Sequence, residues 1–357
     1  MRLLLKLTAV LLLAGAAWLA WALLRPVTPQ RETFVLLPAG FSGRQIARRL
    51  ENSGIIRSST GFLLLHYMRR SRTLKAGEYR FQEPENASQV LDKLIRGEIC
   101  THTVVIPEGF NIFDIAQAIQ QAGLGPAEDF LAEARGDVEL VRGFDPEATS
   151  LEGYLFPDTY EFTRTQSMRD MAQTMVRRFE QEARQIGLDI ASPGPPDRKQ
   201  KPGQDALLPQ PAQPRRLPGT PGGNIHAIVT LASIVEKETA LPKERSLVAS
   251  VYCNRLRRGM ALDADPTVVY AALLNQRYRG AIHQSDLQSD SAYNTYKHAG
   301  LPPGPIANPG SESLRAAMDP ERTNYLYFVA DGQGGHRFTG SYQEHSRNVA
   351  AYRRTQR

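Results

Sequence analysis

The sequence is poor in the residues that cross-link small proteins or bind metals. Among 357 residues only Cys100 and Cys253 are cysteines, which excludes a disulfide framework. The seven histidines show no HExxH pattern and no Cys/His ligand spacing, so we predict no metal and no cofactor. The 43 basic residues form no stripe interleaved with aromatics, which argues against nucleic acid as a partner. The net charge of +6 suits lipid headgroups or a carboxylate-bearing polymer instead.

A long apolar run is present near the N-terminus. From Leu7 to Leu24 the sequence carries no charge, and a helix of about 18 such residues can cross a membrane. Trp18 and Trp21 near its end are typical of a membrane interface. A cleaved signal peptide is the competing interpretation, with Ala20-Trp21-Ala22 as the cleavage site, but the length of the run favours a retained anchor. We expect a cytoplasmic N-terminus and everything after Arg25 on the other side.

A short sequence pattern occurs twice. Residues 35–42, Val-Leu-Leu-Pro-Ala-Gly-Phe-Ser, match residues 104–111, Val-Val-Ile-Pro-Glu-Gly-Phe-Asn. Each copy predicts a short strand, a turn containing Pro and Gly, and a helix that is capped by Ser42 or Asn111. We interpret the pattern as an internal repeat of strand, turn and helix units.

Residues 31–100 are therefore interpreted as a small α+β module. Between the two copies, residues 77–81 alternate like a strand, and residues 87–95 predict a helix capped from Asn86 or Ser88. These short strand and helix units resemble the LysM-like carbohydrate-binding fold, which would let the module hold a glycan. The alternative is that the repeat serves only as a structural spacer.

A proline-rich stretch interrupts the second half of the chain. Residues 191–222 carry nine prolines among glycine, glutamine and lysine. Such a stretch cannot bury enough apolar surface to offset its chain entropy, so we predict a disordered insertion. Helices expected at 168–186 and 225–239 flank it and belong together. The insertion therefore lies inside one domain rather than between two.

The helix expected at 225–239 carries the residues of greatest chemical interest. Its one polar stripe consists of His226, Thr230, Ser233 and Lys237. Glu236 falls off this stripe, in line with Ala232 and Val229, so its carboxylate would end a largely buried apolar row. Burial raises the pKa of a carboxyl group, as a general acid near neutral pH requires. Glu238 lies on the opposite flank, where its surroundings could be similar, and either residue could instead be solvated or salt-bridged.

Further candidate residues follow this helix. Asp265-Pro266 predicts the start of another helix with Asp265 as its N-cap, which favours a structural role over that of a second catalytic carboxylate. Tyr293, Asn294 and Tyr296 precede a proline-fixed loop at 301–310. Stiff loops that bear Tyr and Asn suit a sugar cleft, although an ordinary loop could have the same composition.

Ordered segments along most of the chain carry a family resemblance. They include Leu151-Glu-Gly-Tyr-Leu-Phe-Pro-Asp-Thr-Tyr160, Leu231-Ala-Ser-Ile-Val-Glu-Lys-Glu-Thr239, Ala292-Tyr-Asn-Thr-Tyr296 and Gly300-Leu-Pro-Pro-Gly304. With them the chain resembles the MltG (YceG-like) endolytic murein transglycosylases. Only the proline-rich insertion departs clearly from that pattern.

The resemblance implies a fold and a reaction. The fold would be α+β, with a transmembrane anchor at 1–30, the LysM-like module at 31–100 and a mixed helical and β catalytic domain at 101–357. The enzyme would be a lyase that cleaves the β-1,4 bond between N-acetylmuramic acid and N-acetylglucosamine within nascent strands, leaving 1,6-anhydro ends. The first glutamate of the Ile-Val-Glu-Lys-Glu run, Glu236, would be the acid/base residue. Substrate contacts are expected from Tyr293, Asn294, Tyr296, Glu152, Glu238 and Asp265.

The resemblance also implies a place and partners. The anchor would lie in the cell inner membrane with the catalytic domain in the periplasm, beside penicillin-binding glycan synthases and the glycan strands. Two alternatives stay open. In a hydrolytic muramidase, Asp265, Asp263 or Glu152 would serve as a base, and in a non-catalytic scaffold the chain would only bind glycan.

Overall fold

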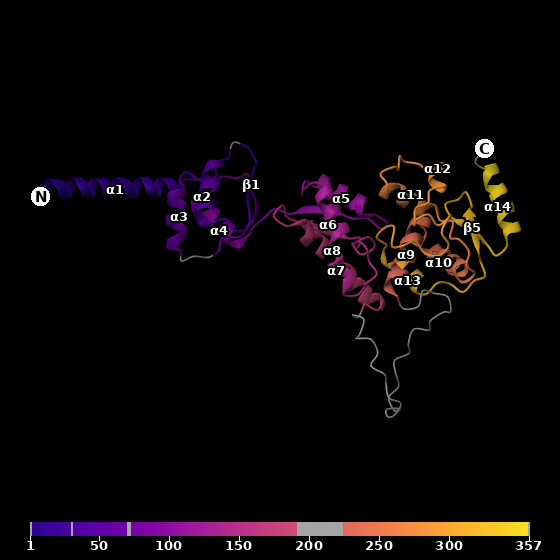
Figure 1. The fold of residues 1–357 in the computed structure, drawn as a ribbon. Coiled ribbons are helices and arrows are strands. Elements are labelled where there is room, and N and C mark those ends of the chain that lie inside the picture. Colours follow the sequence, from indigo (N-terminus) through magenta and orange to yellow (C-terminus); the bar gives the residue numbers. More distant parts are fainter. Residues whose placement is uncertain (1, 30, 70–72, 191–223, 356–357) are drawn as a thin grey trace, which may run out of the picture. The chain divides into compact units, whose positions relative to one another are not determined.

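The computed structural model describes residues 2–29, 31–69, 73–190 and 224–355, and Figure 1 traces the chain. It is a mixed α+β structure in which the described strands pair in twos. The chain divides into two compact units. The first contains Met1–Val104, Gln121–Gly125 and Tyr160–Ser167, and the second contains Val105–Gln120, Pro126–Thr159 and Met168–Arg357. The predicted insertion at 191–222 lies outside the described residues.

The first unit begins with a long apolar helix. Its elements in chain order are α1 (Arg2–Leu24), β1 (Thr33–Leu37), α2 (Gly43–Asn52), α3 (Ser59–Met68), β2 (Gly77–Phe81), α4 (Ala87–Arg96) and β3 (His102–Val105). Lys6–Leu24 has a mean hydropathy of 2.1, and 6% of it is buried inside the protein. A helix this long and apolar can span a membrane, and a signal sequence has the same features.

A small core joins the elements that follow α1. Strands β1 and β2 pair antiparallel with Thr33 opposite Phe81, and Leu50, Tyr79 and Leu94 are fully buried beside them. Ser42 and Gln45 form a capping box at the start of α2. The strands and helices predicted for this module are thus confirmed, whereas its LysM-like character and its repeat stay predictions.

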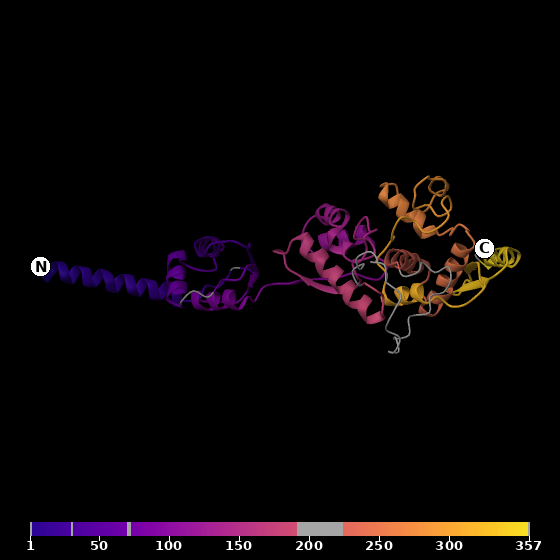
Figure 2. The ribbon, with the colours of Figure 1, turned by 60° about the horizontal axis from the view of Figure 1, so that its bottom comes forward.

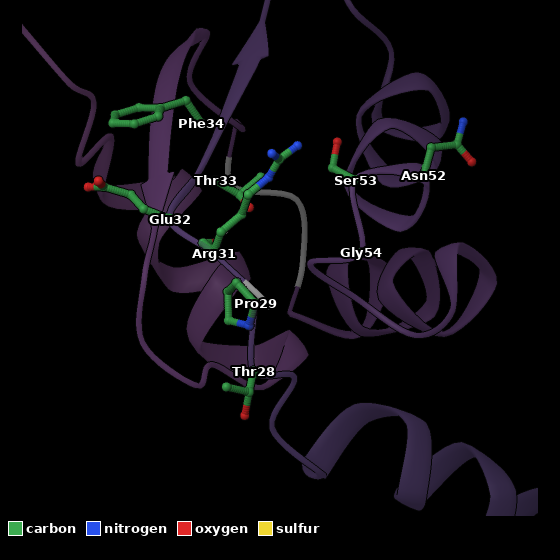
Figure 3. Close-up of a pocket in the computed structure, with 9 residues that line it drawn as sticks. All are labelled: Thr28, Pro29, Arg31, Glu32, Thr33, Phe34, Asn52, Ser53 and Gly54. Carbon is green, nitrogen blue, oxygen red and sulfur yellow. The ribbon is translucent and has the colours of Figure 1, made fainter.

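The first unit also contains an open cavity of about 870 Å³, which Figure 3 shows. Its lining residues are Thr28, Pro29, Arg31, Glu32, Thr33, Phe34, Asn52, Ser53 and Gly54. Phe34 is an aromatic residue that is 50% exposed, and it lies on β1 among polar neighbours. Aromatic surface beside amide and hydroxyl groups is a combination that binds sugars.

The second unit is predominantly helical. Its elements in chain order are α5 (Ile112–Gln121), α6 (Ala127–Gly136), α7 (Glu139–Arg142), β4 (Thr159–Phe162), α8 (Met168–Ile186), α9 (Ile225–Glu238), α10 (Pro242–Arg257), α11 (Asp265–Leu274), α12 (Gln284–Leu287), α13 (Ser311–Met318), β5 (Tyr327–Ala330), β6 (His336–Thr339) and α14 (Tyr342–Thr355). Strand β4 pairs with β3, and β5 pairs with β6 antiparallel. The predicted helices at 168–186 and 225–239 are present as α8 and α9.

Helix α9 is the central element of the second unit. It contacts α10, α11 and α13, and Figures 1 and 2 show these helices around it. Val229, Leu231, Ala232, Ile234 and Val235 are fully buried on it. Each fully buried large aliphatic side chain contributes about 1.5–3 kcal/mol. Residues 229–235 of α9 are all buried, so packing fixes where its C-terminal side chains point.

One predicted helix start is wrong. Asp265 does not cap α11 from outside, because the N-cap residue is Ala264 and Asp265 is the first residue of the helix. Its carboxylate accepts a hydrogen bond from the hydroxyl of Tyr296 at 2.6 Å instead. The hydrogen-bond partner of Asp265 is thus a side chain from a loop that is distant in sequence. The sequence pattern had predicted a backbone N–H of its own helix instead.

Candidate active site

Glu236 lies in a charged cluster rather than in an apolar row. Its Oε1 accepts from Nη2 of Arg245 at 3.0 Å, and its Oε2 accepts from the backbone N–H of Gly310 at 3.0 Å. Nη2 of Arg245 also donates to Glu108 at 3.1 Å. The side chain of Glu236 is 6% exposed, so its predicted burial is confirmed. The predicted apolar surroundings are wrong, because α10 and the loop before α13 bring polar partners to it.

Glu238 has the surroundings that were expected of Glu236. Its Oε1 accepts from the hydroxyl of the fully buried Tyr252 at 2.7 Å. Desolvation raises the pKa of Glu238 to about 7, the Tyr252 hydrogen bond opposes the rise and the charge of Asp265 adds to it. This carboxyl group is therefore protonated in a substantial fraction of molecules near neutral pH. Such a group can donate a proton and then take one back.

Two cavities meet at Asp265. The Lys237 cavity, about 300 Å³ in volume, is lined by residues that include Asn111, Lys237, Asp265, Tyr270, Tyr278 and Ile306. The Glu238 cavity, about 340 Å³, is lined by residues that include Glu238, Asp265, Tyr296, Tyr327, Tyr342 and His345. Lys237 and Glu238, which follow each other at the end of α9, thus line two neighbouring cavities. Both volumes lie at the lower end of the range for small-molecule sites.

The proline-fixed loop is held against α9 by the polar stripe of that helix. The ring nitrogens of His226 lie 2.8 Å from Oδ2 of Asp145 and 2.9 Å from the carbonyl oxygen of Pro303. Because both partners accept, this geometry favours the ring that carries a proton on both nitrogens. The Asp145 hydrogen bond raises the pKa of His226, against the effect of burial. Further along the stripe, Oγ of Ser233 accepts from the N–H of Ile306 at 3.0 Å.

Glu152 is buried in the interior of the second unit and does not line either cavity. It is 1% exposed and accepts from the N–H of Ile112 at 3.1 Å and from Nδ2 of Asn308 at 2.9 Å. Burial raises the pKa of Glu152 to about 8. Its partner Asn308 also accepts from the N–H groups of Gly153 and Leu155, each at 2.9 Å. Glu152 therefore joins three chain segments, a location that does not fit the predicted contact with substrate.

The predicted Tyr and Asn residues divide between the surface and the interior. Asn294 is completely buried, and its Nδ2 donates to the carbonyl oxygens of Leu287 and Ser289 at 3.0 and 2.7 Å. It shapes the loop and is not available to a ligand. Tyr293 packs its ring 5.1 Å from that of Tyr270, which lines the Lys237 cavity. Tyr296 is 39% exposed and lines the Glu238 cavity.

Several site residues were missed by sequence reasoning. Tyr252 and Arg245 lie on α10 and donate hydrogen bonds to the two glutamates of α9. The apolar pattern of α10 did not indicate these contacts. Tyr342 and His345 lie on α14, one helical turn apart and on the same face, and this spacing was a usable signal. Cys253, also on α10, is buried as a free thiol.

Comparisons with known proteins agree with this architecture. The endolytic murein transglycosylase of Bacillus subtilis is 29% identical, over 96% of this chain and 91% of that protein. The endolytic murein transglycosylase of Streptococcus pneumoniae serotype 2 is 28% identical over 92% of this chain, which spans 60% of that longer protein. A crystal structure of a putative YceG-like protein from Listeria monocytogenes is 29% identical, covers 89% of this chain and 99% of that one, and has a TM-score of 0.52. The profile of the YceG-like family matches residues 35–351. The chain belongs to the YceG-like family.

Proposed function

We propose that this protein is an endolytic peptidoglycan lytic transglycosylase and that Glu236 is its acid/base residue. The observation that carries the proposal is a buried carboxyl group near the end of α9 that Arg245 and the Gly310 N–H hold in place, at the position to which the family resemblance assigns the acid. The names of the Bacillus and Streptococcus relatives support the same activity. The bond cleaved would be the β-1,4 linkage between N-acetylmuramic acid and N-acetylglucosamine within a nascent strand.

The reaction needs one carboxyl group, which acts first as a general acid and then as a general base. Glu236 gives its proton to the glycosidic oxygen as the bond to C1 of the muramyl residue breaks. The resulting carboxylate takes the proton of the muramyl C6 hydroxyl, whose oxygen bonds to C1 and closes a 1,6-anhydro ring. No water is consumed, and Glu236 ends protonated. Because the nucleophile belongs to the substrate, its high effective concentration replaces a second carboxylate.

Glu238, two residues further along α9, is the alternative acid/base residue. It accepts from the Tyr252 hydroxyl, has a pKa raised to about 7 by desolvation, and lines a cavity. The oxygens of Glu236 accept from the Arg245 guanidinium and the Gly310 N–H. The two glutamates therefore differ in their partners, and a matched pair of variants distinguishes them.

Product analysis with two matched variants tests this proposal. The full chain in detergent is incubated with uncrosslinked glycan strands, and the products are identified by mass spectrometry. We expect anhydro ends from the wild type, and Glu236→Gln should lower turnover by about 10²–10⁴-fold. Glu238→Gln, two residues away on α9, should keep measurable turnover. Full activity in Glu236→Gln with none in Glu238→Gln would move the role to Glu238.

A hydrolytic muramidase is the second candidate, because Asp265 lines both cavities at the end of α9 and offers a second carboxylate. Such an enzyme would use the second carboxylate to activate water. Its products would have reducing ends that are one water heavier than anhydro ends. The same mass spectra therefore decide between the two reactions.

The first unit suggests where the enzyme works. We propose that α1 anchors the chain in the cell inner membrane with a cytoplasmic N-terminus, which places the catalytic domain in the periplasm. The LysM-like module would hold glycan through the cavity that contains Phe34 and Asn52. Penicillin-binding glycan synthases are the proposed partners, because they deliver nascent strands at the same membrane surface. Co-purification of the full chain with such synthases tests the last point.

A further inference from the structure

Helix α3 of the first unit has an exposed apolar face. Leu64, Tyr67 and Met68 are 43%, 71% and 72% exposed, and their spacing places them on one side of the helix. Phe62, on the opposite side, is fully buried in the core of the unit. Single exposed apolar residues are common, whereas a contiguous apolar patch marks a surface that binds a partner or a membrane.

The same helix packs against the end of α1. Gly61 lies one turn before Leu64, and a Cβ added to it would lie 3.3 Å from methyl carbons of Leu19 and Leu23. Leu23 also packs against the core of the unit, and Ala22 beside it is 3% exposed. Figures 1 and 2 show α3 running across the C-terminal end of α1. The exposed face of α3 therefore begins where α1 contacts the helix.

The length of α1 fixes the depth of this contact. Lys6–Leu24 contains 19 residues, which is close to the length that crosses a hydrocarbon core. Leu19 precedes Leu24 by about 8 Å along the helix axis, at 1.5 Å per residue. Amphipathic helices at a membrane surface bury their apolar faces by about 5–10 Å at the boundary between headgroups and acyl chains. With α1 across the membrane, α3 therefore lies at the depth of such a surface helix.

Charged residues at both ends of α3 suit the same location. Just before the helix, the guanidinium of Arg57 lies 4.7 Å from the ring centroid of Trp21 and donates to the carbonyl oxygen of Pro26 at 3.3 Å. Tryptophan rings and long basic side chains are typical of the headgroup level of a membrane. At the other end, Arg69 forms an ion pair with Asp92 of α4. Both ends of α3 are thus fixed, and its exposed face has a defined direction.

We propose that the exposed face of α3 inserts into the surface of the membrane that α1 crosses, on the side away from the N-terminus. The inference rests on the proposed anchoring by α1 and goes beyond it. A single span leaves the first unit free to tilt and turn, whereas a second contact fixes its orientation to the bilayer. Lipid fits this face better than a protein partner, because the lipid around α1 already borders the face at Gly61 and a protein would have to displace it.

Quenching of a fluorescent label by lipid tests this contact. The full chain carrying Cys100→Ser is reconstituted in vesicles of phosphatidylethanolamine and phosphatidylglycerol, and part of the lipid carries a nitroxide high on an acyl chain. The label is attached to Met68→Cys or, one turn earlier, to Leu64→Cys, while the buried Cys253 stays unlabelled. Glu98→Cys, whose side chain is 49% exposed between α4 and β3, is the matched control. Substitutions at such exposed positions cost little stability.

We expect the nitroxide to quench both labels on α3 several-fold more strongly than the control label. Adding Tyr67→Asp to the Met68→Cys chain should lower that quenching, because a charge opposes insertion. Equal quenching of the Met68→Cys and Glu98→Cys labels overturns the proposal.

Two further measurements separate the α3 contact from the anchor. A Met68→Cys label that neither the nitroxide nor aqueous iodide quenches would overturn the proposal, since protein would then cover the face. Flotation of the vesicles measures anchoring by α1 independently. A chain that floats without quenching on α3 keeps its anchor and loses the second contact, whereas a chain that does not float contradicts both.

Discussion

Tyr252 and Glu238 form a buried hydrogen bond in which the phenol donates to Oε1 of the carboxylate at 2.7 Å. This bond favours the ionised carboxylate, whereas desolvation and the charge of Asp265 favour the protonated form. The balance sets the pKa of Glu238 at about 7. The acid form is present below that pH and is lost above it, so the fraction of protonated Glu238 should fall as the pH rises through about 7.

Replacing Tyr252 with Phe should raise the pKa of Glu238. The variant removes the hydrogen bond that lowers this pKa, so the carboxyl group stays protonated to a higher pH. NMR titration of the Glu238 carboxyl group in both proteins measures the shift. Stability should fall by only about 1 kcal/mol, because the side chains are nearly the same shape. A midpoint that stays in place would mean that the Tyr252 hydrogen bond contributes little to the pKa of Glu238.

Replacing Asp265 with Asn should have the opposite effect. The variant removes a negative charge that raises the pKa of Glu238, so the titration midpoint of Glu238 should move to lower pH. Tyr296→Phe is the control, because it removes the 2.6 Å hydrogen bond to Asp265 but keeps the charge. A shift in Tyr296→Phe that equals the shift in Asp265→Asn would mean that loop position, and not charge, causes it.

His226 should make the stability of the second unit depend on pH. Its folded pKa is raised above 6.5, so its contribution is complete below 6.5 and is lost as the pH rises through the folded value. His226→Phe leaves Asp145 without its charged partner and should cost about 2–4 kcal/mol below pH 6.5. Denaturant unfolding of both proteins across this range measures the difference. A difference that grows with rising pH would contradict a cationic His226.

Asn308 should be a site of severe destabilisation. Its side chain accepts from Gly153 and Leu155 and donates to Phe110 and Glu152, all at 2.9 Å. Asn308→Ala leaves these buried groups unpaired and should cost about 3–5 kcal/mol in denaturant unfolding.

Asn275 provides the matched control for that variant. It is exposed at the end of α11 and donates to the Ala271 carbonyl oxygen at 2.9 Å. Asn275→Ala should therefore cost less than about 1 kcal/mol. Similar losses in both variants would mean that the buried network around Asn308 contributes little.

Local signals in the sequence predicted most elements correctly. The pairing of Ser42 with Gln45 begins α2, and the pairing of Asn86 with Gln89 begins α4, in each case within one turn of chain. Asp265 misled the same reasoning, because its partner Tyr296 lies on a distant loop. Hydrogen bonds between residues that are far apart in sequence produce no periodic pattern in the sequence.

The sequence by itself determined that α9 would be a buried helix ending in two glutamates, because apolar side chains occupy most of its circumference. It did not determine which glutamate faces a cavity. Tertiary structure decided that question, since α10 brings Arg245 to Glu236 and Tyr252 to Glu238. On a helix packed on nearly all sides, periodicity fixes the direction of a side chain, but only the neighbouring elements fix whether it meets a cation, a phenol or an open cavity.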